Sequence, residues 1–191
     1  MVNLTSGSGD YHSSIWSPDG KHIAFLSAQP PNIGGDIHVA DLDGSNPVQI
    51  TSGYESAFLE WSPDGKHLAF DSFRDRNFDI YVVDINGSHS TNLTNNPTND
   101  SGARWSPDGQ HIAFESNRSG IFKVYIMDAD GSNLTDLGLS IGGDSPAWSP
   151  DGSSIAFSSL DKNNSYEIYV VDINGQNLRR LTNGPTDSSP A

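Results

Sequence analysis

The chain has 191 residues, with 24 Asp and Glu against 10 Lys and Arg, which gives a formal net charge of −14. A chain this acidic lacks the basic surface that binding to nucleic acid or to an anionic membrane requires. Cysteine is absent, which excludes disulfides, thiolate zinc sites and cysteine nucleophiles. No apolar run approaches the roughly 18 residues that span a bilayer, and the polar residues 1–10 do not resemble a signal peptide.

A five-residue motif, Trp-Ser-Pro-Asp-Gly, recurs four times at spacings of 43 to 45 residues. Its tryptophans are Trp16, Trp61, Trp105 and Trp148, its aspartates Asp19, Asp64, Asp108 and Asp151, and its glycines Gly20, Gly65, Gly109 and Gly152. Each copy precedes an Ile/Leu-Ala-Phe triplet, an alternating apolar segment that ends in Asp, and an Asp-Gly or Asn-Gly pair. Self-similarity at this period predicts repeat units over approximately 10–53, 54–97, 98–141 and 142–184, with an extra copy of the last strand at 2–5.

Each unit is predicted to form four short antiparallel strands, as the second unit illustrates. Ser-Pro-Asp-Gly favours a type I turn, which joins a strand that ends at Trp61 to one that begins near Lys66. The third strand, 79–84, is rich in β-branched and aromatic residues. Asn86-Gly87 then predicts a type I′ hairpin turn, which takes two positive φ values. Repeated four-stranded units predict an all-β fold, a single β-propeller domain built from four four-stranded antiparallel blades.

These residues carry a family resemblance. The succession Trp-Ser-Pro-Asp-Gly-x-x-Ile-Ala-Phe, Ile-Tyr-Val-x-Asp, Asp-Gly-Ser-Asn and Leu-Thr resembles the Pro-Asp type of blade found in TolB-like β-propellers, over almost the whole chain. It is also similar to the propellers that cap the hydrolase domain of prolyl-oligopeptidase-type peptidases. Departures fall in loops, with Gly138 in place of Thr and Pro30-Pro31 in the first unit. The resemblance implies an interaction platform in the bacterial periplasm or cell envelope.

Several repeated side chains are predicted to be structural. A tryptophan at one position of every blade is expected to pack between adjacent sheets, with its indole N–H bonded to one partner. His22, His67 and His111 share a repeat position with Ser154, which favours a lateral or solvent-facing position over a zinc site. Segments 41–44 and 128–131 superficially resemble a calcium loop, but hairpin chemistry accounts for them.

Acidic residues precede each tryptophan, at the connection from one blade to the next. They are Asp10, Glu55, Asp100 and Asp144, and Asp187 has the same place after the fourth unit. Because first strands line the channel of a propeller, these carboxylates could ring a channel mouth, raise each other's pKa and hold a cation such as calcium. The favoured alternative is that each acidic side chain caps its own loop through an Asx-turn. No cofactor is therefore expected, and calcium is retained only as a weaker alternative.

No catalytic motif stands out, since the chain has no Gly-x-Ser-x-Gly elbow, no His-Glu-x-x-His pair and no phosphate loop. We therefore predict a non-enzymatic scaffold that presents loops and a channel mouth to a protein or peptide partner. The alternative is the propeller part of an enzyme, either a peptidase-gating propeller or a sugar-acid lyase-like protein. Matching repeats at both ends predict a homodimer that closes an eight-bladed ring, with a closed four-bladed monomer as the alternative and a fragment of a longer array as the third interpretation.

Overall fold

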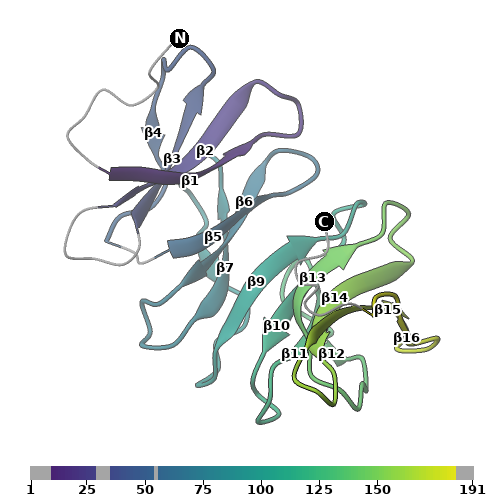
Figure 1. Ribbon diagram of the computed structural model, residues 1–191. Coiled ribbons are helices and arrows are strands. Elements are labelled where there is room, and N and C mark those ends of the chain that lie inside the picture. The colour runs from purple at the N-terminus through teal and green to yellow at the C-terminus, as the bar shows by residue number, and fades with distance from the viewer. Residues whose placement is uncertain (1–9, 29–34, 54–55, 184–191) are drawn as a thin grey trace. The chain divides into compact units, whose positions relative to one another are not determined.

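The computed structural model describes residues 10–28, 35–53 and 56–183. All regular secondary structure in these ranges is β-strand, numbered β1 to β16 in chain order (Figure 1). The predicted all-β fold is therefore confirmed. This part of the chain contains no helix of the length and apolarity needed to cross a membrane.

The strands fall into four groups of four, which we call blades 1 to 4. Blade 1 contains β1 (Asp10–Trp16), β2 (His22–Ala28), β3 (Gly35–Asp41) and β4 (Val48–Gln49). Blade 2 contains β5 (Ser56–Trp61), β6 (His67–Ser72), β7 (Asp79–Asp84) and β8 (Thr91–Asn92). Blade 3 contains β9 (Asp100–Trp105), β10 (His111–Ser116), β11 (Lys123–Asp128) and β12 (Thr135–Asp136). Blade 4 contains β13 (Asp144–Trp148), β14 (Ser154–Leu160), β15 (Tyr166–Asp172) and β16 (Arg179–Arg180).

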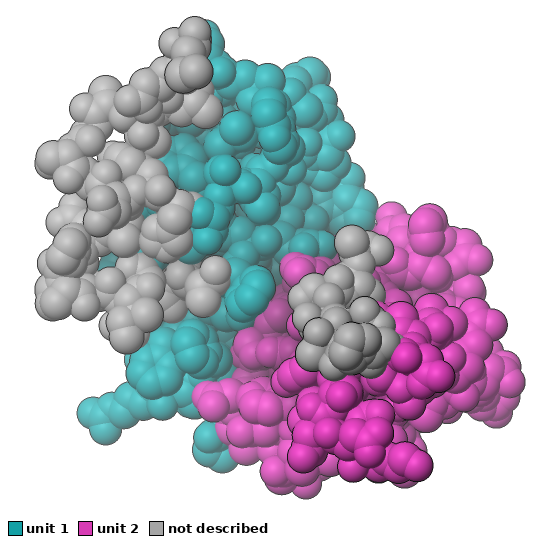
Figure 2. All heavy atoms as spheres, in the orientation of Figure 1, with its two compact units in different colours: residues 1–97 teal, residues 98–191 magenta. Residues whose placement is uncertain are grey.

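Each blade is an antiparallel meander with its first and fourth strands at the edges. One bridge between Gly35 and Ser56 also joins blades 1 and 2 into an eight-stranded sheet. The chain divides into two compact units of two blades each, residues 1–97 and 98–191, coloured separately in Figure 2. The division coincides with the predicted boundary between the second and third repeat units. The predicted strand copy at 2–5 and the Pro30-Pro31 loop lie outside the described residues.

The Ser-Pro-Asp-Gly segment forms the predicted turn between the first and second strands. In blade 2, the Gly65 amide donates to the Ser62 carbonyl oxygen (2.9 Å), and Gly65 has the positive φ of +69° that glycine accepts most readily. The Asp64 carboxylate accepts from the Ser62 hydroxyl (2.6 Å) and the Lys66 amide (3.0 Å). The His67 amide donates in turn to the Ser62 hydroxyl (3.0 Å). The same serine–aspartate contact recurs at Asp19, Asp108 and Asp151.

These contacts change the titration of the turn carboxyls. The Ser149 hydroxyl, and after it the Ser153 amide, lower the pKa of Asp151 from 3.8 to about 2. Since the folded-state pKa is the lower one, the ionised turn contributes stability above about pH 4 and loses it as the pH falls toward 2. The repeated aspartates therefore act in the turns, as predicted from the motif.

The turn between β7 and β8 is not the predicted type I′ turn. Gly87 has a φ of +80°, but Asn86 does not have the positive φ that a type I′ turn requires. The Gly87 amide donates to the Asp84 carbonyl oxygen (2.8 Å), and the Asn86 side-chain oxygen accepts from the Ser88 amide (2.9 Å). This bond to the amide two residues on holds Asn86 in an Asx-turn with ordinary φ. The second positive φ falls instead at His89 (+54°).

Apolar side chains of successive blades pack against each other within each unit. In the first unit, one buried cluster combines residues of blade 1 with residues of blade 2, among them Leu26, Ile37, Leu68 and Phe70. In the second unit, a corresponding cluster combines residues of blades 3 and 4, among them Val124, Leu137, Ile155 and Phe157. The core of each unit therefore lies between its two sheets.

The repeated tryptophans lie at these inter-sheet contacts where an earlier blade of the same unit is present. The Trp61 indole Nε1 donates to the Ile15 carbonyl oxygen (3.3 Å), and the Trp148 indole Nε1 donates to the Arg104 carbonyl oxygen (2.9 Å). Trp61 is only 7% exposed. The predicted packing and single indole partner are confirmed for both residues. Trp16 of blade 1 departs from the prediction, because 62% of its surface is exposed. Trp105 of blade 3 departs in another way, because it is buried but its indole Nε1 has no hydrogen-bond partner among the described residues.

Replacing Trp61 with Ala is predicted to lower the free energy of unfolding by about 3–5 kcal/mol, because it removes a buried aromatic ring from the contact between two blades. Phe58→Ala is the matched control, since Phe58 is an aromatic residue of the same strand that is 50% exposed. It is expected to cost about 0.5 kcal/mol or less. Urea denaturation measures both, and equal midpoints for the two variants would contradict the inter-sheet role of Trp61.

Candidate functional site

Exposed apolar side chains gather where the second strand of a blade turns into the third. In the second unit, the loops 117–122 and 161–165 make these connections, at the end of the blades opposite to the Ser-Pro-Asp-Gly turns. In and beside them lie Ile121 (52% exposed), Phe122 (41%), Leu160 (47%) and Tyr166 (38%). We call these four residues the loop rim. Two adjacent blades thus present apolar side chains at one end.

The first of these loops is held in place by neighbouring backbone. The Gly143 amide, in the connection from blade 3 to blade 4, donates to the Phe122 carbonyl oxygen (2.9 Å). A side chain at Gly143 would meet the Phe157 ring at 2.6 Å, so glycine allows this close approach. At the other end of the loop, the Asn99 amide donates to the Asn117 side-chain oxygen (2.9 Å). The backbone that carries Ile121 and Phe122 is therefore fixed by hydrogen bonds at both ends of the loop.

Asp100, one of the predicted acidic positions, is the partner of an arginine. Its side chain is fully buried, and its Oδ2 accepts from Arg118 Nη2 (2.9 Å). Arg118 also donates through Nε to the Ser116 hydroxyl (2.9 Å) and lies 5.1 Å from the centre of the Tyr125 ring. This ion pair ties the first strand of blade 3 to the loop that carries part of the rim.

Asp144 occupies the same position in blade 4 but has different neighbours. Glu115 accepts from the Ser101 hydroxyl through Oε1 and from the Ser145 amide through Oε2, both at 2.9 Å, and so links blades 3 and 4. Burial, and after it the nearby Glu115 carboxylate, raise the pKa of Asp144. Sequence reasoning missed Glu115, whose repeat position is held by Leu26 in blade 1, Asp71 in blade 2 and Ser158 in blade 4.

The remaining acidic positions are less fully defined. Glu55 and Asp187 lie outside the described residues, and Asp10 is described only as the first residue of β1. Over residues 10–28, 35–53 and 56–183, no group of three or more His, Asp or Glu side chains is arranged to hold a metal ion. A calcium ion at the five predicted positions stays a prediction.

Each of the repeated histidines lies beside an aspartate of its own blade. Each begins a second strand and pairs in register with the last residue of the third strand. The pairs, with their nitrogen–oxygen distances, are His22 with Asp41 (3.4 Å), His67 with Asp84 (3.0 Å) and His111 with Asp128 (3.6 Å). In blade 4 the Ser154 hydroxyl donates to Asp172 (3.5 Å). These residues close hairpins at the turn end of the blades.

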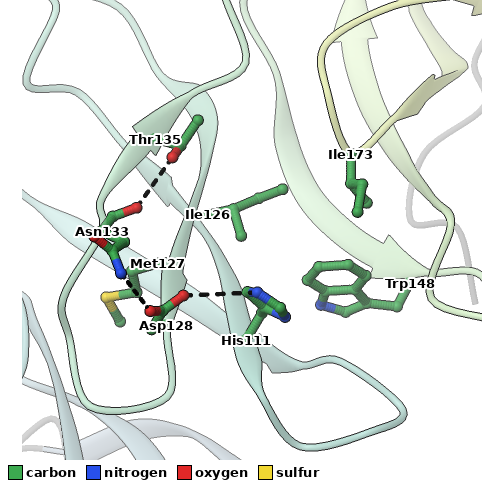
Figure 3. A pocket seen from close by; sticks show the side chains of 8 residues that line it. All are labelled: His111, Ile126, Met127, Asp128, Asn133, Thr135, Trp148 and Ile173. Carbon is green, nitrogen blue, oxygen red and sulfur yellow. Dashed lines mark hydrogen bonds and ion pairs between the residues drawn. The ribbon is translucent and has the colours of Figure 1, made fainter.

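A cavity of about 180 Å³ lies beside one of these pairs, between blades 3 and 4 (Figure 3). Its lining includes His111, Asp128, Asn133, Trp148 and Ile173. The ring centres of His111 and Trp148 are 6.4 Å apart. Asp128, which pairs with His111, also accepts through Oδ2 from Asn133 Nδ2 (2.6 Å). The polar groups that line this cavity are therefore engaged with each other.

This arrangement of blades has known relatives. A family model described as the TolB beta propeller domain matches residues 2–191. The chain belongs to this family. Among solved structures, a TolB-like protein from Agrobacterium tumefaciens is 24% identical, with a TM-score of 0.70 over 94% of this chain and 83% of its own. TolB from Acinetobacter baumannii is 28% identical, with a TM-score of 0.75 over 98% of this chain and 47% of its own.

An enzyme is also similar in structure. A puromycin-hydrolyzing peptidase from Mycobacterium tuberculosis is 20% identical, with a TM-score of 0.78 over 98% of this chain and 31% of its own. No curated protein matches the chain. The chain thus spans less than half of the Acinetobacter protein and less than a third of the peptidase. Relatives of both kinds share the propeller fold, and a fold by itself does not decide function.

Glu115→Gln is predicted to bring the pKa of Asp144 down toward 3.8, because it removes the neighbouring negative charge and leaves only burial to raise it. A raised folded-state pKa favours the protonated carboxyl, so Asp144 contributes stability at low pH that is lost as the pH rises through that pKa. NMR titration of the Asp144 carboxyl measures the shift, with Asp130→Asn as an exposed control. An unchanged Asp144 midpoint in Glu115→Gln would contradict the coupling.

Proposed function

We propose that the chain is a non-enzymatic binding module that presents the loop rim to a protein or peptide partner. The observation that carries this proposal is the exposure of Ile121, Phe122, Leu160 and Tyr166 at one end of two adjacent blades. Gathered apolar and aromatic side chains on a folded surface are typical of interaction sites. The ion pair of Asp100 with Arg118 and the Gly143 contact support the proposal, because they hold the rim in position before binding.

The negative charge of the chain indicates that its partner carries basic residues. The net charge of −14 attracts basic segments over a distance, and Glu115 and Asp144 lie near the rim end of the blades. A partner with apolar side chains flanked by Lys or Arg would fit both features. The proposal includes a location in the bacterial cell envelope and a homodimeric assembly. The location rests on membership of the TolB beta propeller family.

Binding through the rim is tested with a randomised peptide library displayed on phage. We expect selection to enrich peptides that combine apolar and basic residues. Phe122→Asp should weaken their binding at least about tenfold, or roughly 1.4 kcal/mol, because it places a charge in the apolar contact. Leu134→Asp is the matched control, since Leu134 is equally exposed (45%) but lies beside β12, near the turn end.

Two results would contradict the proposal. One is an equal effect of Phe122→Asp and Leu134→Asp on every selected peptide. The other is turnover of peptides or oligosaccharides by the purified chain, which would favour the enzyme alternative.

A further inference from the structure

Blade 4 exposes a face that blades 1 and 3 bury. In those two blades, this face packs on the next blade through an alanine, two β-branched residues and the apolar residue that directly follows the fourth strand. These residues are Ala24, Ile37, Val39 and Ile50 in blade 1, and Ala113, Val124, Ile126 and Leu137 in blade 3, all buried. Their equivalents in blade 4 are Ala156, Ile168, Val170 and Leu181, which we call the trailing face. The first three are partly exposed and Leu181 is 56% exposed.

Blade 1 exposes part of the opposite face of the same kind of contact, whereas Phe25 (6% exposed) and Ala40 (1%) of that face are buried. We call Trp16 and Ile23 the leading face. Trp16 is 62% exposed, whereas Trp61 at the same position of blade 2 is 7% exposed. Ile23 is partly exposed, whereas its equivalent Leu68 is fully buried. The two end blades thus carry the two halves of one interface.

The complete interface within each unit indicates how these halves fit. The indole of the later blade donates to the carbonyl oxygen of the residue before the earlier blade's tryptophan, as Trp148 does to Arg104. Leu137, the apolar residue that follows the earlier blade's fourth strand, belongs to the buried cluster against which Trp148 packs. The corresponding groups on blade 4 are the Ala147 carbonyl and Leu181. A trailing face therefore offers a leading face both a carbonyl oxygen that can accept from the tryptophan indole and an apolar residue that can cover it.

We propose that the leading face of one chain docks on the trailing face of a second copy, with the Trp16 indole bonded to the Ala147 carbonyl of that copy. The second copy presents the same two faces, so a two-fold pair forms this contact twice and leaves neither face exposed. The pair contains eight blades, within the usual range of about 4–8 for a propeller. This inference specifies the homodimer of the proposed function and does not involve the loop rim.

Light scattering at micromolar concentration tests the pairing. The wild-type chain is expected at twice the 20.5 kDa mass of one chain. Trp16→Glu and Leu181→Glu should each give 20.5 kDa with an unchanged far-ultraviolet spectrum, because a charge enters an apolar contact. Phe122→Asp, in the loop rim, should leave the mass doubled. That control separates failure of the pairing from failure of the rim as a binding site.

Mixing the two variants tests the head-to-tail geometry. A Trp16→Glu chain keeps an intact trailing face, and a Leu181→Glu chain keeps an intact leading face, so one native contact forms between them. An equimolar mixture should therefore regain mass above 20.5 kDa, while each variant alone does not. A wild-type monomer, as a closed four-bladed ring would give, overturns the proposal. So does a ladder of larger masses, or a mixture that stays monomeric.

Discussion

Within each unit, a blade buries most of the apolar side chains of one face against the neighbouring blade. Each four-stranded sheet has two apolar faces, as Phe70 and Ile80 illustrate on opposite sides of blade 2, and a sheet standing alone would leave both in water. Trp61 and Trp148 add a directional element, because the indole N–H of each donates to the backbone of the earlier blade in its unit. Burial and hydrogen bonding thus join blades in one order, which makes the stability of each blade depend on its neighbours.

Much of the fold could be predicted from local chemistry. The turn formed by residues 62–65 depends on groups within a few residues of each other, so proline, aspartate and glycine at fixed spacing predict it. The third strand of blade 2 has the predicted bounds, 79–84, because the β-branched and aromatic residues between its two aspartates favour extended backbone. The type I′ assignment at Asn86 was wrong because residue preference alone did not reveal that its side chain bonds to the Ser88 amide.

Features that depend on distant partners could not be predicted in the same way. Trp16 and Trp61 occur in the same motif, yet their exposure differs because only Trp61 has an earlier blade beside it. The first residue of the third strand is Asp79 in blade 2, bonded to Asn92, whereas in blade 3 it is Lys123, paired with Asp136. The partners of such residues, like those of Glu115, depend on strand register and on the neighbouring blade.

Hydrogen exchange of the indole N–H groups tests the dependence of each blade on its neighbour most directly. In a solution dilute enough to keep the chain monomeric, the indoles of Trp61 and Trp148 should exchange slowly, because each is bonded to the backbone of an earlier blade. The indole of Trp16, which is mostly exposed, should exchange at nearly the rate of a free indole. Equal and rapid exchange of all three would contradict the account.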